Sequence, residues 1–320
     1  MTMDNSAESG PTAIISSQEF QESWDWLLGI TVQPIPIQGY GYSLDHKHWQ
    51  SQDCLKCIDQ CENADTYLAR LYLISQLASV SDYLSDIKVR SFSFELRYHG
   101  TKLDPDVARV VNAEETKNHL NAFRNSFSEH LAYWVILASI IKTPGYQDFS
   151  IAKPNLQPED KGPDGLAYVF YDNSESIIKI ISVKNSINSP QELISSPSFR
   201  KGTVLELDEK KILDEFYAFQ HHNRGFQRLD DKLNSLLQEL HCDSENQLRR
   251  ALLINHSQFN ASVIADERHA DNNLFIGFKI ISGDSDRCIG IYIGSDNWKN
   301  LASRVQAKVK EVLSRNGISF

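Results

Sequence analysis

The chain has few of the features that mark secreted or membrane-spanning proteins. Only five of its 320 residues are cysteine, too few and too unevenly placed for the disulfide framework of a secreted protein. No apolar run reaches the roughly 18 residues that a membrane helix needs, and the longest one, 131–141, predicts a buried helix. The first residues also lack the basic and apolar parts of a signal peptide. We therefore expect a cytoplasmic protein with no membrane partner.

The sequence also lacks a surplus of positive charge and two common catalytic motifs. Its net charge is -10 at pH 7, which argues against indiscriminate coating of nucleic acids but is compatible with a local DNA-binding surface. No phosphate-binding loop of the G-x-x-x-x-G-K-[ST] type is present, so the chain is not expected to be a nucleotide-driven motor itself. The serine-nucleophile motif G-x-S-x-G is missing as well.

Hydrophobic patterns predict a mixture of helices and strands, and so an α/β or α+β fold. Helices are expected at 14–28, within 53–86, and at 113–142, 203–240 and 297–315, and strands at 88–100, 161–186, 249–257, 273–282 and 287–294. The Asp-Pro-Asp at 104–106 interrupts the pattern and suggests a boundary. We therefore expect a disordered tail at 1–12, an accessory α+β region at 13–110 and a second domain at 113–320.

One stretch, 161–186, organises the second domain. It reads KGPDGLAYVF, YDNSES and IIKIISVKNS, which predicts two strands joined by a polar turn. Asp164 enters the first strand, and Lys184 lies near the end of the second. Because side chains alternate across a strand, Ser182 and Lys184 should share one face and Val183 should occupy the other.

A Pro-Asp entering one strand and an x-x-Lys ending its neighbour resemble the motif of the PD-(D/E)xK nuclease superfamily. The resemblance implies a restriction-endonuclease-like central mixed sheet flanked by helices. It also implies that Asp164 binds metal, that Lys184 is the catalytic lysine, and that Val183 offers its carbonyl. Glu129, in the long helix at 113–142, would assist as a further metal-binding carboxylate. The implied cofactor is Mg²⁺ or Mn²⁺, a hard cation that takes oxygen ligands and activates water for phosphodiester hydrolysis.

Ser182 departs from the superfamily pattern, because it stands where an Asp or Glu is expected. Some restriction endonucleases are similar, with Ser-Val-Lys on the strand and a glutamate recruited from the following helix. Glu192 is the nearest candidate for that replacement, and Glu206 and Glu209 are alternatives. The run Ser189-Pro190-Gln191-Glu192 also has the pattern of a helix start with Glu192 in a capping box. Both interpretations of Glu192 stay open.

The resemblance leads to the hypothesis of a metal-dependent DNA endonuclease of bacterial restriction or antiphage defence. Such an enzyme is either a stand-alone homodimer or the nuclease subunit of a complex with a helicase or other ATPase. The layout that follows Lys184 is similar to the nuclease subunit of Hachiman defence systems. The alternative is a binding or scaffold subunit with the same fold, in which Ser182 marks a catalytically decayed site.

A third hypothesis is an interaction protein stapled by zinc. Its ligands would come from the imidazoles and thiolates of His46, His48, Cys54, Cys57 and Cys61, which are groups that zinc prefers. Residues 54, 57, 58 and 61 also fall on one helical face, which favours packing of the cysteines in a helix core.

Overall fold

The computed structural model describes residues 12–30, 58, 61–78, 94–114, 122–143, 145–151, 154, 164–171, 176–187, 257–266 and 288–320. Within these residues the chain is a mixed α+β protein. Its helices are α1 (Ser17–Ile30), α3 (Ala64–Leu77), α5 (Pro105–Val111), α6 (Ala122–Lys142) and α12 (Trp298–Arg315). Its strands are β1 (Thr12–Ile15), β2 (Leu96–Tyr98), β3 (Tyr146–Ile151), β4 (Gly165–Tyr171), β5 (Ser176–Ser186), β6 (Ser257–Asp266) and β7 (Cys288–Ser295).

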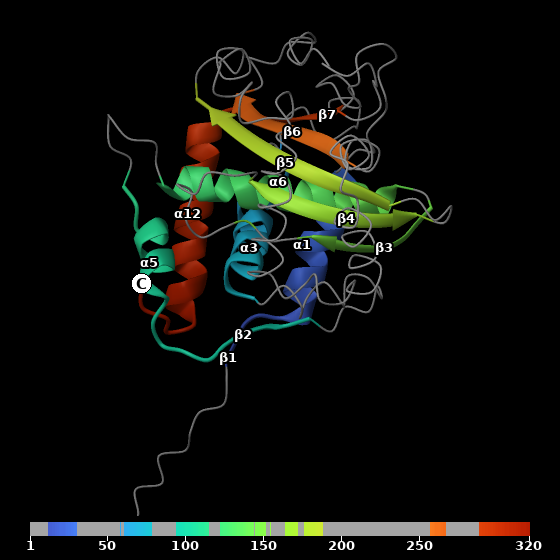
Figure 1. Ribbon diagram of the computed structural model, residues 1–320. Helices are drawn as coiled ribbons and strands as arrows, with labels where there is room; N and C mark the ends of the chain where they lie inside the picture. The colour runs from blue at the N-terminus through green and yellow to red at the C-terminus, as the bar shows by residue number, and fades with distance from the viewer. Residues whose placement is uncertain are drawn as a thin grey trace, which may run out of the picture.

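A five-stranded sheet with the order β3-β4-β5-β6-β7 forms one layer of the fold (Figure 1). Strands β3, β4 and β5 pair antiparallel, whereas β5, β6 and β7 pair parallel. The sheet is therefore mixed, and β5 lies at its centre. Strands β4 and β5 are the predicted hairpin, with Gly165 opposite Ile181. A second, two-stranded antiparallel sheet pairs β1 with β2.

Helices α6 and α12 cover one face of the large sheet (Figure 1). Helix α6 contacts β3, β4 and β5, while α12 contacts β6 and β7. The apolar second half of α6, residues 130–140, is buried throughout, as its composition predicts. Where the two helices meet, Phe127 stacks on Trp298 with their ring centroids 5.3 Å apart. None of the described helices is long and apolar enough to span a membrane.

Helix α3 packs on the outer side of α6 and α12, and α1 packs on α3. Buried polar groups form hydrogen bonds across the α3–α6 contact: Ser75 Oγ lies 2.7 Å from His130 Nδ1, and Trp134 Nε1 donates to the Leu71 carbonyl. One hydrophobic core extends from Ile14 to Ile318. The division into regions 13–110 and 113–320 stays a prediction, and helices from both regions contribute to this core.

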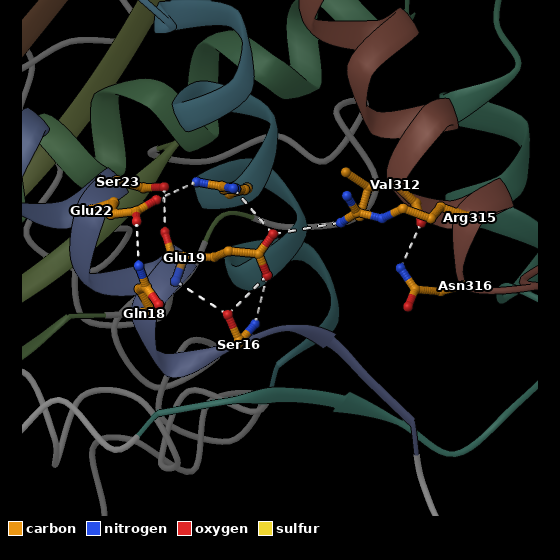
Figure 2. Close-up of polar contacts among 9 residues, drawn as sticks. Ser16, Gln18, Glu19, Glu22, Ser23, Val312, Arg315 and Asn316 are labelled. Carbon is orange, nitrogen blue, oxygen red and sulfur yellow. Dashed lines mark hydrogen bonds and ion pairs between the residues drawn. The ribbon is translucent and has the colours of Figure 1, made fainter.

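Glu19 joins three helices at the surface (Figure 2). The Ser16 N–H donates to Glu19 Oε2 and the Glu19 N–H donates to Ser16 Oγ, which is a capping box at the start of α1. Arg70 of α3 and Arg315 of α12 lie 3.1 and 3.5 Å from Glu19 Oε1. Burial raises the pKa of Glu19, but the Ser16 hydrogen bonds and the two arginines outweigh it and hold the pKa below its ordinary value.

The last helix confirms its prediction most closely. Helix α12 buries the predicted stripe of Trp298, Leu301, Val305, Val309 and Val312. It ends in a Schellman motif, in which the Ile318 N–H donates to the Leu313 carbonyl and the Gly317 N–H to the Ser314 carbonyl. Gly317 has a φ of 70°, the left-handed conformation that this motif requires and glycine adopts without strain.

Three predictions about elements need correction. Residues 104–106 begin a helix instead of interrupting the pattern: the Asp104 side chain accepts the Asp106 N–H, and Pro105 occupies the first turn of α5. The strand expected at 249–257 lies outside the described residues except for Ser257, and the strand that begins there, β6, continues to Asp266, past the expected end. Strand β3 was not expected at all, and it occupies the outer edge of the sheet beside β4.

Several predictions concern residues outside the described ranges. These are residues 1–11 of the tail expected at 1–12, whose last residue, Thr12, begins β1. They are also the helix at 203–240, the strand at 273–282, and the potential ligands His46, His48, Cys54, Cys57, Glu192, Glu206 and Glu209. Of the potential zinc ligands, Cys61 is described. It is half-buried and packs against the hydrophobic core.

Candidate functional site

Asp164 lies where β4 begins, beside the last residues of β5. Its Oδ2 accepts a hydrogen bond from the Val183 N–H at 2.5 Å. The next residue, Gly165, packs closely on β5, because a Cβ there would lie 3.3 Å from Ile181 Cδ1. Strand β5 continues to Ser186 beyond its pairing with Gly165, so the Asp164 carboxylate binds the backbone of β5 just past the end of the β4–β5 ladder.

Lys184 reaches the same carboxylate oxygen from β5. Its Nζ lies 3.9 Å from Asp164 Oδ2, and the side chains of Lys184 and Asp164 are 37% and 22% exposed. Val183, whose N–H binds Asp164, is buried, as expected from side-chain alternation. The predicted meeting of an acid and a lysine from two neighbouring strands is therefore confirmed, and solvent or a ligand can reach both groups.

Glu129 completes the group from α6. It is half-buried, at the point where the helix becomes apolar on all sides. Burial and the negative charge of Asp164 raise the pKa of Glu129 to about 8, while the Lys184 ammonium acts in the opposite direction. The structure thus brings Glu129 within electrostatic range of both strand residues. A carboxyl group in such a setting is typical of functional sites.

The Val183 carbonyl projects toward the same space as the Asp164 carboxylate. In a β-ladder the N–H and C=O of one residue point to the same neighbouring strand. Since the Val183 N–H is directed at Asp164, its carbonyl leaves β5 at that edge too. Two carboxylates and a carbonyl are the oxygen ligands that Mg²⁺ and Mn²⁺ prefer. A bound cation would also stabilise the charges of Asp164 and Glu129, so this donor set fits a hard divalent ion.

The described residues do not supply a third acidic ligand. Among them, no three His, Cys, Asp or Glu side chains are grouped closely enough to hold a metal ion. Ser182 lies within β5 in the position predicted for it, between Ile181 and Val183. Whether Glu192, Glu206 or Glu209 replaces the missing acid stays a prediction, because these residues lie outside the described ranges.

Sequence reasoning missed a cluster of polar side chains immediately behind the site. Asn185 Nδ2 donates to Asn125 Oδ1 at 3.1 Å and to Ser128 Oγ at 3.0 Å. Trp298 Nε1 donates to Asn185 Oδ1 at 3.4 Å. The sequence does contain a pattern that could have indicated this cluster: Asn125, Ser128 and Glu129 have the i, i+3, i+4 spacing that places polar residues on one face of a helix. This cluster directly joins the strand that carries Lys184 to the helix that carries Glu129.

A second lysine of β5 is distinct from this arrangement. Lys179 is buried on the helix-covered face, in line with Ile181 and Val183, and burial lowers its pKa to about 8.

Comparison of the chain with protein-family models, with curated proteins and with solved structures finds no match. Function is therefore inferred from the chemistry of Asp164, Lys184 and Glu129.

Proposed function

We propose that the protein is a metal-dependent DNA endonuclease of the PD-(D/E)xK type, with a restriction-endonuclease-like fold over residues 113–320. One observation carries the proposal: Asp164 Oδ2 binds the Val183 N–H and lies 3.9 Å from Lys184 Nζ. Asp164 and Lys184 occupy the Asp and Lys positions of the motif, while Ser182 stands in place of its second acid. They lie at the entry to β4 and in β5, which are adjacent and antiparallel. The electrostatic influence of Asp164 and Lys184 on Glu129 supports the third predicted member of the site.

Each residue has a role in phosphodiester hydrolysis. Asp164, Glu129 and the Val183 carbonyl would hold Mg²⁺ or Mn²⁺, which when bound supplies an activated water and neutralises charge on the phosphate. The Val183 N–H keeps the Asp164 carboxylate oriented. The Lys184 ammonium has three N–H donors, which can bind a phosphate oxygen and stabilise the charge that develops there. The exposed fractions of Asp164 and Lys184 make them accessible to a polymer substrate.

The proposed biological setting is bacterial restriction or antiphage defence in the cytoplasm. It rests on the sequence resemblance to restriction endonucleases and to the nuclease subunit of Hachiman systems. The partners that follow from it are DNA, a helicase or other ATPase subunit, and a second copy of the chain.

Cleavage of DNA by the full-length chain tests the activity. We would incubate it with supercoiled and linear duplex DNA in Mg²⁺, alone and with an ATPase encoded beside it. Lys184→Ala and Asp164→Asn should each lower the cleavage rate by about a hundredfold or more. Asp164→Asn keeps an oxygen that can accept the Val183 N–H, so a lower cleavage rate in this variant would result from the lost charge and not from misfolding. The matched control is Lys102→Ala, at an exposed position. Equal cutting by wild type and Lys184→Ala would refute the assignment.

A binding or scaffold subunit is the second candidate. It is favoured by the serine at position 182 and by the absence of a third acidic ligand among the described residues. This candidate predicts that Mg²⁺ and Mn²⁺ leave the melting temperature unchanged and that Asp164→Asn has no effect on the metal response. A metal-dependent rise in melting temperature that disappears in Asp164→Asn would count against it.

A further inference from the structure

The side-chain amide of Asn185 makes hydrogen bonds through both its nitrogen and its oxygen where β5, α6 and α12 meet. Both hydrogens of its NH₂ group are donated to α6, one to Asn125 Oδ1 and one to Ser128 Oγ. The Ser128 hydroxyl donates its own hydrogen to the Asn125 carbonyl at 2.7 Å. This leaves a lone pair of Ser128 Oγ directed at Asn185, so the oxygen can accept the Asn185 hydrogen. Trp298 Nε1 donates to the remaining Asn185 oxygen. Each partner therefore fixes the orientation of the Asn185 amide.

The surroundings of this amide are mainly apolar. Val183 on the same strand, Ile264 beside Asn185 on β6, and Trp298 are all buried. Hydrophobic contacts hold two elements together but are not directional, so they do not by themselves fix the position of a helix along a strand. Hydrogen bonds have a narrow range of distance and angle. The Asn185 bonds are therefore the directional part of the contact between β5 and α6.

The location of these bonds relates them to the site. Asn185 follows Lys184 directly, and Ser128 precedes Glu129 directly. A shift of α6 along β5 would change the distance from Glu129 to the Asp164–Lys184 pair. The geometry points to Asn185 as a positioning residue: through Asn125 and Ser128 it sets the spacing between the helix carboxylate and the strand residues of the site. This inference rests on the proposed nuclease function.

Two isosteric substitutions separate positioning from charge. Asn185→Asp replaces the donating NH₂ group with an oxygen that faces Asn125 Oδ1 and Ser128 Oγ. The bond to Asn125 Oδ1 is lost, and the Ser128 hydroxyl can bind the new oxygen only by giving up its bond to the Asn125 carbonyl. Asn125→Asp adds the same charge at nearly the same place but keeps an oxygen that accepts from Asn185. Ser128→Ala is a milder variant that removes one bond. Gln306→Leu is the stability control, because it removes two amide bonds to the Val111 and Ala113 carbonyls, between α12 and the end of α5.

We would measure kcat and KM for Mg²⁺-dependent DNA cleavage, the melting temperature, and Mn²⁺ affinity by electron paramagnetic resonance. Asn185→Asp should lower kcat at least about tenfold more than Asn125→Asp does, since misplacement of about 1 Å can reduce rates a hundredfold. KM for DNA should change less than about twofold. Ser128→Ala should lower kcat by a smaller factor, and Gln306→Leu should lower the melting temperature without lowering kcat.

Equal losses in Asn185→Asp and Asn125→Asp would overturn the inference, because added charge would then explain both. So would an Asn185→Asp variant that loses thermal stability but keeps kcat, as expected for Gln306→Leu. If Asn185→Asp does not fold, Ser128→Ala decides, and an unchanged kcat in this variant counts against positioning.

A wild-type chain that binds Mn²⁺ but cuts no DNA refutes the nuclease function alone. Weaker Mn²⁺ binding in Asn185→Asp than in Asn125→Asp would then still support positioning, and equal binding would overturn it. A wild-type chain that neither cuts DNA nor binds Mn²⁺ overturns both.

Discussion

Replacing Glu129 with glutamine should stabilise the protein at alkaline pH and have little effect on its stability at pH 4. Burial and the Asp164 charge raise the pKa of Glu129 from 4.5 to about 8. In the unfolded chain the carboxyl loses its proton near pH 4.5, whereas in the folded protein it keeps the proton until about pH 8. The folded state therefore binds more protons across this window. The stability that Glu129 contributes is fully present below pH 4.5 and is lost as the pH rises through 8.

The size of the effect follows from the shift. Each pKa unit corresponds to about 1.4 kcal/mol, so the full shift sets an upper limit of about 5 kcal/mol. Glu129 is only half-buried, and solvent screens part of the interaction, so we expect about 2 to 3 kcal/mol. Glutamine has the shape of a protonated glutamate and never ionises. The free energy of unfolding of Glu129→Gln should exceed that of wild type by this amount at pH 9 and equal it at pH 4.

Urea denaturation followed by tryptophan fluorescence at both pH values measures the difference. Comparing the variant with wild type at each pH cancels the contribution of other groups such as Lys179. Glu114→Gln, at an exposed position, is the matched control and should show no such dependence on pH. Mg²⁺ should raise the stability of wild type at pH 9 and raise that of Glu129→Gln less. A Glu129→Gln variant that is less stable than wild type at pH 9, or shifted equally at both pH values, would refute the reasoning.

Two further predictions concern stability away from the site. Glu19→Gln should lower the free energy of unfolding by about 1 to 2 kcal/mol at pH 7, because it loses charge-assisted bonds. Since the folded-state pKa of Glu19 lies below its ordinary value, this difference should vanish as the pH falls through that lowered pKa, and an equal loss at pH 7 and pH 2 would contradict it. Gly317→Ala should destabilise by about 1 kcal/mol because its φ is 70°. Gly29→Ala, at an exposed position in the last turn of α1 with nothing within 4 Å of the new methyl, should stabilise by up to a similar amount. Melting temperatures that move in the same direction would contradict this pair.

Local patterns made part of the fold predictable. The β4–β5 hairpin follows from a run of β-branched residues beside a polar turn, and its antiparallel pairing brings Asp164 to Val183 and Lys184. Helix α12 follows from its strict apolar spacing and the glycine after its end. These elements are specified by neighbours in sequence. The meeting of Asp164 and Lys184, on which the proposed site depends, could therefore be predicted without coordinates.

The features that the sequence did not predict depend mainly on contacts between segments that are far apart in the chain. Strand β6 pairs with β5 from about 70 residues further along the chain, and its buried Ser262 and Asp266 weaken the apolar signal of a central strand. Asp266 is satisfied there because its carboxylate accepts the Trp298 N–H at the start of α12. Helix α5 is short, and its Asp-Pro start has the same composition as a turn. The Asn185 bonds likewise depend on the docking of α6 and α12, which no local pattern encodes.

Two glutamates in this fold lie in opposite electrostatic surroundings. Glu19 is surrounded by donors from three elements, its pKa is lowered, and its charge stabilises the packing of α1, α3 and α12. Glu129 has an acid and a lysine as its electrostatic neighbours, its pKa is raised to about 8, and its charge destabilises the folded protein. A buried helix and a central strand hold Glu129 in this unfavourable place. Natural proteins retain such local conflicts mainly where function requires them. A divalent cation would resolve the conflict by stabilising both acidic charges, which is the electrostatic argument for the proposed site.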